Sequence, residues 1–70
     1  MYNPLLDTFI AVVDCGSFTK ASEKLFISPT AVMKQINNLE DHLNLKLIDR
    51  NFSGIKLTAA GEVIYRDAKV

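Results

Sequence analysis

The residues that most often perform catalysis or bind metals are scarce in this sequence. It contains one cysteine, Cys15, and one histidine, His42. A tetrahedral zinc site needs about four ligands and a disulfide needs two thiols, so we expect neither within this chain. Glu40 and Asp41 are neighbours on an expected helix, where their side chains point about 100° apart and cannot act as an acid–base pair. The sequence therefore predicts no enzyme, no metal site and no cofactor.

Polar side chains at helical spacing indicate a binding surface instead. Ser28 followed by Pro29 is a typical helix start, because the hydroxyl can cap a free amide and proline at the first position loses no hydrogen bond. Beyond this start, one side of the helix is apolar: Val32, Ile36, Leu39 and Leu43. The opposite face is polar and has two residues beside it: Thr30, Lys34, Asn37 and Asp41, flanked by Met33 and Asn38. Such a helix buries one side and offers the other to a partner.

Three further helices are expected around this one. The first begins at Pro4 and stops at Gly16, since glycine is common just beyond a helix end. The second has about two turns and is capped by Ser17. A tight connection without glycine joins it to the helix that follows Ser28. The fourth begins after Thr58, another residue that can cap a helix.

The stretch between the third and fourth helices predicts a short β-hairpin. Apolar and polar residues alternate over 45–47 and again over 55–57, as they do in strands with one buried side. Residues 49–54, between them, are rich in turn formers. We therefore expect two weak strands joined by a loop, and we call the segment 48–57 the wing.

These elements predict a mostly α-helical winged helix-turn-helix. Residues 1–58 would form this domain, with the helix-turn-helix at 18–37, and residues 59–70 would begin a linker and dimerisation helix. In this architecture the helix that starts near Pro29 enters the DNA major groove, and the hairpin lies along the neighbouring backbone. The sequence reaches Val70 without a glycine, a proline or a capping residue that would end the last helix. This suggests a piece of a longer protein.

The placement of charge supports a DNA partner, although the net charge does not. Eight basic residues balance eight acidic ones over the 70 residues. Between residues 17 and 57, however, six basic residues stand against four acidic ones, a balance of +2. The hydrophobic content of 49% is too high for a disordered segment. No apolar run approaches the roughly 18 residues of a membrane span, and the N-terminus lacks a secretory signal.

Several stretches together resemble the DNA-binding domain of LysR-type transcriptional regulators. They are Gly-Ser-Phe-Thr-Lys-Ala at 16–21, Leu25, Ser-Pro-Thr-Ala-Val-Met-Lys-Gln-Ile at 28–36, Leu-Glu at 39–40, Leu-Ile-Asp-Arg at 47–50 and Lys-Leu-Thr-Ala-Ala-Gly-Glu at 56–62. Their order and spacing make the resemblance specific, and it covers essentially the whole chain. It implies a bacterial cytoplasmic regulator whose small-molecule effector domain lies beyond this sequence.

The resemblance also assigns residues to double-stranded DNA and to a dimer. The groove-facing and phosphate-contacting positions of the family fall on these residues: Pro29, Thr30, Met33 and Lys34 in the groove, and Ser17 and Arg50 at phosphates. Further positions on the outer helix face and the wing complete the predicted DNA-binding set: Asn37, Asn38, Ser53 and Lys56. The helix that starts at Thr58 is implied to form a homo-oligomer, a dimer or larger, through three apolar residues: Val63, Ile64 and Ala68.

Three positions depart from the family pattern. The family commonly has glutamine and serine where this chain has Pro29 and Met33, so base recognition should be more apolar. Met33 or Thr30 against a thymine methyl group is one example. The wing tip of the family often carries an arginine that enters the minor groove, and this chain has Ser53 there. The resemblance therefore does not carry the minor-groove contact over to this chain.

Several of these assignments have a plain structural alternative. Lys34 is either a DNA contact or a solvated lysine, and Met33 either touches bases or fills a gap. Arg50 either binds a phosphate or pairs on the surface with Asp49 or Glu40. The apolar side of the last helix is either a dimer surface or core packing. For the whole chain the alternative is a winged-helix module that binds protein and not DNA, which the zero net charge favours.

Overall fold

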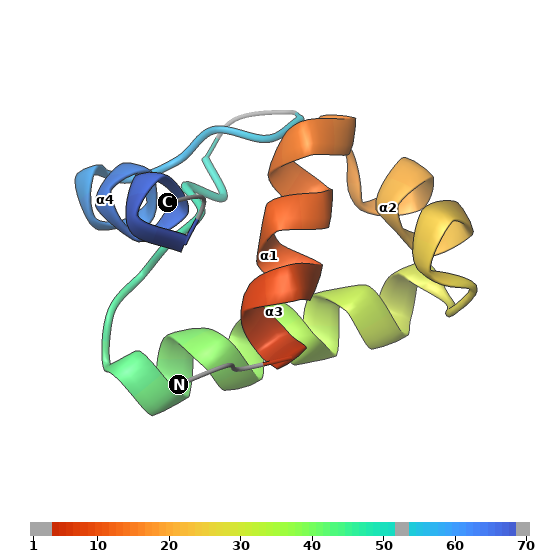
Figure 1. The fold of residues 1–70 in the computed structure, drawn as a ribbon, viewed down its shortest axis with the longest axis horizontal. Helices are drawn as coiled ribbons and strands as arrows, with labels where there is room; N and C mark the ends of the chain where they lie inside the picture. The colour runs from red at the N-terminus through yellow and green to blue at the C-terminus, as the bar shows by residue number, and fades with distance from the viewer. Residues whose placement is uncertain (1–3, 52–53, 69–70) are drawn as a thin grey trace.

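A computed structural model describes residues 4–51 and 54–68. Its four helices are α1 (Pro4–Cys15), α2 (Phe18–Leu25), α3 (Pro29–Leu43) and α4 (Ala59–Ala68). Figure 1 shows α1 crossing the centre of the molecule, with α2 and α4 on either side of it and α3 running beneath. The four expected helices are confirmed.

The caps expected from the sequence set the helix boundaries. The Ser17 hydroxyl accepts from the Lys20 amide at 2.9 Å, and the Ser28 hydroxyl accepts from the Ala31 amide at 3.1 Å. Each bond satisfies an amide that has no partner within its own helix. At the other end of α3, Asn44 adopts the left-handed conformation, with φ 56° and ψ 38°, and closes the helix.

The core lies between α1, α3 and the segment after α3. α1 contacts each of the other three helices, and α2 also contacts α3. The largest fully buried side chains come from α1, α3 and the chain just beyond α3: Phe9, Val12, Val32, Ile36, Leu39 and Leu47. Three members of the apolar side predicted for α3 are therefore fully buried, while Leu43 is half-buried.

The turn between α2 and α3 is held without glycine. Phe26 caps α2 in the left-handed region, with φ 60° and ψ 38°, and its amide donates to the Ser22 carbonyl. The next amide, of Ile27, donates to the same carbonyl at 3.1 Å. The left-handed conformation costs an L-residue roughly 1–2 kcal/mol, and these two bonds offset part of that cost. The Phe26 side chain is 93% exposed.

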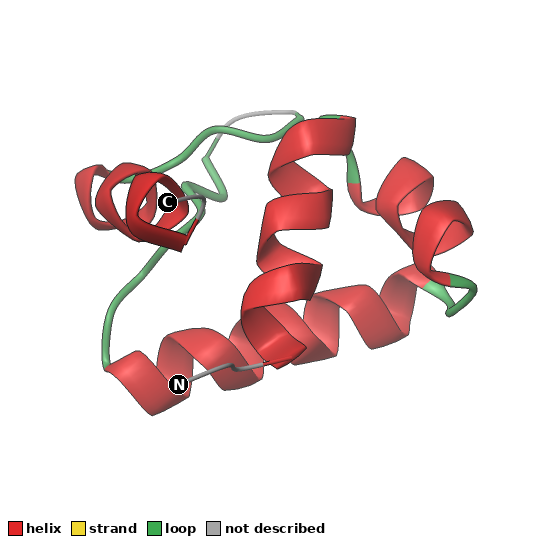
Figure 2. Cartoon of the chain, viewed as in Figure 1, coloured by secondary structure: helices red, strands yellow, loops and turns green. Residues whose placement is uncertain are grey.

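The prediction of a two-stranded wing is wrong for the described residues, which form no strand (Figure 2). A single antiparallel bridge joins Ile48 to Leu57. Two backbone bonds flank it, from the Asp49 amide to the Lys56 carbonyl at 2.7 Å and from the Thr58 amide to the Leu47 carbonyl at 3.0 Å.

The side chains explain why the pairing extends no further. Leu47 and Ile48 are both buried, so the inward–outward alternation of a strand is lost, and Leu45 is 44% exposed where the alternation would bury it. The amides of Leu47 and Ile48 donate to the Glu40 side chain. A second strand therefore cannot use them.

α4 is anchored at its first turn and along one side. The Thr58 hydroxyl donates to the Lys46 carbonyl and accepts from the Gly61 amide at 3.0 Å. Gly61 is buried, and a Cβ there would overlap the carbonyl oxygen of Leu47. This close approach requires glycine, so the first turn of α4 fits directly onto the segment after α3.

Tyr65 connects α4 to α1. Its ring meets Phe9 edge to face, with ring centroids 6.5 Å apart and planes at 80°. Its hydroxyl donates to Asp14, near the end of α1. The direction of α4 is therefore fixed at two points, Gly61 and Tyr65.

Gly61→Ala should lower the free energy of unfolding by about 1–3 kcal/mol, the usual cost of forcing extra atoms into a packed site. The sign of this change shows whether the added methyl group clashes. Where nothing clashes, alanine in a helix interior is more stable than glycine by up to about 1 kcal/mol. Urea denaturation measures the change. Ala59→Gly, at the exposed start of α4, is the control and should cost no more than about 1 kcal/mol. Stabilisation by Gly61→Ala would contradict the close approach.

Candidate nucleic-acid interface

The polar face predicted for α3 lies on the outside of the molecule. Its inner side is buried in the core, and Met33, beside the polar face, is 41% exposed. The predicted groove-facing residues and their neighbours are all exposed: Pro29, Thr30, Met33, Lys34, Asn37 and Asn38. The amphipathic pattern thus placed these side chains correctly, and their contact with DNA stays a prediction.

Ser17 and Arg50 lie on either side of an open cleft beside that face. The cleft lies between the start of α2 and the wing, and is lined by Ser17, Phe18, Thr19, Ile48, Asp49, Arg50, Gly54 and Ile55. The start of α2 carries a partial positive charge from its unpaired amides, and Arg50 adds a guanidinium. The two predicted phosphate contacts are thus brought together, although they are 33 positions apart in the sequence.

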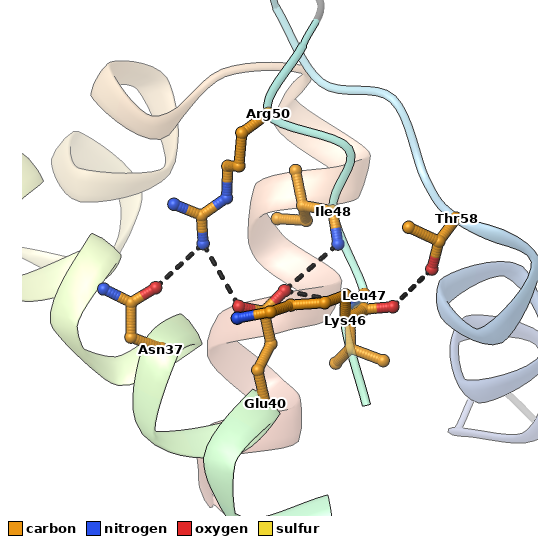
Figure 3. Close-up of polar contacts among 7 residues, drawn as sticks. All are labelled: Asn37, Glu40, Lys46, Leu47, Ile48, Arg50 and Thr58. Atoms are coloured by element: carbon orange, nitrogen blue, oxygen red, sulfur yellow. Dashed lines mark hydrogen bonds and ion pairs between the residues drawn. The ribbon is translucent and has the colours of Figure 1, made fainter. Parts of the chain in front are cut away.

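Glu40 connects α3 to the wing from inside the protein (Figure 3). The residue is 4% exposed, and its Oε2 accepts from the Leu47 amide at 2.8 Å and the Ile48 amide at 3.2 Å. Its other oxygen, Oε1, faces Arg50 at 3.3 Å. Hydrogen bonds to both oxygens compensate the cost of burying the charge.

Arg50 is held by three side chains. Its Nη2 donates to Asn37 Oδ1 at 2.9 Å and to Glu40 Oε1 at 3.3 Å. Its guanidinium also lies 5.9 Å from the centre of the Phe18 ring, within the range of a cation–π contact. The sequence left open a pair with Asp49 or Glu40, and the structure forms the pair with Glu40. The Arg50 side chain remains 41% exposed, so a phosphate contact stays a prediction.

Sequence reasoning offered a surface pair of Arg50 with Glu40, but it missed that Glu40 is buried and accepts two backbone amides, and that Arg50 also donates to Asn37. The available signal was the position of Glu40 directly after Leu39, at the edge of the apolar side of α3. An acidic residue there, with an arginine ten positions later in the next element, could have been recognised as a candidate buried pair.

The remaining predicted DNA-binding residues belong to the wing. Lys56 is exposed on its second arm, and its carbonyl accepts the bond that flanks the bridge. Ser53 lies outside the described residues. The wing contact of Ser53 therefore stays an expectation from the sequence.

The three residues predicted to form a dimer do not share one environment. Val63 is 44% exposed. Ile64 is half-buried and packs against the hydrophobic core, and Ala68 is also half-buried. Of the three, Val63 is the one that α4 presents outward, while Ile64 holds α4 to the body of the domain.

Two kinds of feature are absent from residues 4–51 and 54–68, the part of the chain that the structure describes. No helix there is both long enough and apolar enough to cross a membrane. No group of three or more histidine, cysteine or acidic residues there is placed to hold a metal ion.

A family model described as "Bacterial regulatory helix-turn-helix protein, lysR family" matches residues 4–62, from the start of α1 into α4. The chain belongs to the LysR family. Among curated proteins, this LysR-family chain is 44% identical over 69 residues to the HTH-type transcriptional regulator CysL of Bacillus subtilis. The match covers 99% of the chain and 23% of CysL. The chain thus spans about a quarter of the length of the curated relatives that it matches.

Solved structures of LysR-family proteins have the same fold. The BenM_DBD/catB site 1 DNA complex superposes with a TM-score of 0.92 at 39% identity, covering 99% of this chain and 74% of that chain. The CbnR_DBD–DNA complex gives a TM-score of 0.88 at 36% identity, covering 99% of this chain and 79% of that one. Both comparison structures contain DNA.

Glu40→Gln should lower the free energy of unfolding of this LysR-family domain by about 1–3 kcal/mol. Glutamine keeps the shape of the side chain, but it removes the charge that both backbone amides and Arg50 share, and its amino group has no acceptor on a guanidinium. Urea denaturation measures the loss. Glu23→Gln, an exposed position on α2, is the control and should change stability by less than about 0.5 kcal/mol. Equal effects of the two changes would rule out the proposed role of Glu40.

Proposed function

We propose that this LysR-family chain is the sequence-specific DNA-binding domain of a bacterial transcriptional regulator. The observation that carries the proposal is the exposed outer face of α3, with the cleft between Ser17 and Arg50 beside it. A helix face that can contact base edges, next to donors for phosphates, is the arrangement that helix-turn-helix proteins use. The two DNA-bound comparison structures support it.

In this proposal the first half of α3 enters the major groove. Pro29, Thr30 and Met33 offer methyl and methylene groups, which suit thymine methyl groups, and Lys34 offers a charged donor. Asn37 and Asn38 continue the same face. Ser17, Arg50 and the wing, including Lys56 and Ser53, contact the phosphate backbone and set the register of α3 on the duplex.

The intact protein would act as a cytoplasmic dimer or larger homo-oligomer. We propose that α4 continues as the dimerisation helix and that a further domain binds a small-molecule effector. Residues 1–58 would then be the DNA-binding unit and residues 59–70 the start of the linker. The exposed Val63 supports this role for α4.

A protein-binding module is the second candidate, because the net charge is zero. The salt dependence of binding distinguishes the DNA-binding domain from the protein-binding module. Binding through phosphates releases counterions and weakens steeply as salt rises, whereas a protein–protein contact need not.

Lys34→Ala should weaken DNA binding at low salt. If Lys34 meets a guanine edge, the loss should be about 1–3 kcal/mol and confined to one base position. If it meets a phosphate, the loss should be the same on all sequences, and the salt slope should fall by about one. Anisotropy titrations at several salt concentrations distinguish these cases. Lys46→Ala is the control: it removes the same charge beyond the other end of α3 and should weaken DNA binding less. Equal affinities of wild type and Lys34→Ala for DNA would favour the protein-binding module.

The intact protein should sediment as a dimer or larger, and Val63→Glu should shift it toward monomer. A charge at an exposed apolar contact must be desolvated when the helices pair. Sedimentation velocity over a concentration series gives the oligomeric state. Glu62→Gln, at the neighbouring exposed position, is the control and should leave the state unchanged. A Val63→Glu protein that dimerises as tightly as wild type would place the interface elsewhere.

A further inference from the structure

The contact between Arg50 and Asn37 fixes which atom of the Asn37 carboxamide faces outward. Arg50 Nη2 carries two hydrogens and lies within reach of two acceptors, Asn37 Oδ1 at 2.9 Å and Glu40 Oε1 at 3.3 Å. A guanidinium has donors and no acceptor, so only the oxygen of the carboxamide can face it. The amino group of Asn37 must then point the other way, as Figure 3 shows.

Arg50 is itself held firmly enough to impose this orientation. Glu40 is 4% exposed, and its second oxygen is fixed by the backbone amides of Leu47, just before the wing, and Ile48, its first residue. The Phe18 ring lies 5.9 Å from the guanidinium. Arg50 therefore links the position of the wing to the orientation of one side chain on α3. Its Nη1 and Nε remain to serve a phosphate.

Asn37 is exposed and stands one helical turn beyond Met33 and Lys34 on the outer face of α3. An unconstrained asparagine can bind adenine with two bonds, donating to N7 and accepting from N6. The Asn37 oxygen faces Arg50 at 2.9 Å, so the adenine N6 amino group would have to share that oxygen with a charged donor and approach a guanidinium that repels its hydrogens. Guanine presents two acceptors side by side, N7 and O6, and suits an amino group alone.

We infer that Arg50 makes Asn37 a donor-only contact in the major groove that selects guanine over adenine. Arg50 is a positioning residue in this scheme, and Asn37 is the residue that determines specificity. The inference rests on the proposed DNA-binding function and adds the base class that one position of the site must contain.

The test first recovers binding sites for the wild-type chain from a random duplex pool at low salt. Anisotropy titrations then use duplexes that differ at a single base pair. Wild type should prefer guanine at one position by roughly 5- to 150-fold, the range of one good base contact. A preference for adenine at the position that depends on Asn37 would overturn the inference.

Asn37→Asp is the decisive variant. It preserves the shape of the side chain and an oxygen for Arg50, and it replaces the outward donor with an acceptor. Cytosine offers a donor, its N4 amino group, so the preferred pair at that position should invert from G·C to C·G. Asn38→Asp adds the same charge at the next exposed residue. It should weaken binding on all sequences without inverting any pair.

Arg50→Met tests the positioning role separately. It releases the Asn37 oxygen, so the preference for guanine over adenine at that position should shrink toward equality while preferences elsewhere persist. The ratio of affinities for two duplexes does not depend on the folded fraction, so a loss of stability does not obscure this result. An unchanged ratio would overturn the positioning role.

The failures of the two proposals look different. If Asn37→Asp weakens salt-dependent binding by one factor on every duplex, the inference is wrong and the DNA-binding function stands. If the wild-type chain binds no duplex in a salt-dependent way, the proposed function itself fails.

Discussion

The buried carboxylate of Glu40 is the interaction on which the arrangement of the interface depends. A charge with 4% exposure is tolerated only where its oxygens are hydrogen-bonded. Here the partners are two backbone amides and the guanidinium of Arg50. If the segment after α3 moved away, an unpaired carboxylate would remain beside the core. The position of the wing relative to α3 is therefore set by a side chain of α3 itself.

The hydrogen bonds to Glu40 take the place of the sheet that would otherwise hold the wing of a winged fold. In the described residues, the wing has one bridge, between Ile48 and Leu57, and two flanking backbone bonds. So short a pairing would be marginal alone. Glu40 holds the first arm to α3, and the close contact of Gly61 with Leu47 holds the second arm through the start of α4. The position of Arg50 beside the outer face of α3 thus depends on these two contacts together with the single bridge, and not on a regular sheet.

The helices and the outer face of α3 could be predicted because they depend on local rules. Ser28 with Pro29 fixes where α3 starts, and the spacing of its apolar residues fixes which side is buried. Glu40 could not be placed in the same way, since a glutamate is normally exposed and its partners belong to another element. For the same reason the sequence predicted a more regular wing than the structure has. Nothing in the local sequence shows that the amides of Leu47 and Ile48 already donate to Glu40.

The end of the binding face on α3 follows from the charges along it. The net charge of the chain is zero, but the acidic groups are not all available to repel a phosphate backbone. Glu40 is buried against Arg50, and Asp14 accepts from Tyr65 at the α1–α4 contact. Asp41 is exposed one turn after Asn37. A carboxylate there disfavours a phosphate, so the DNA-binding face that we propose runs from Pro29 to about Asn38 and leaves the last turn and a half of α3 to support the fold.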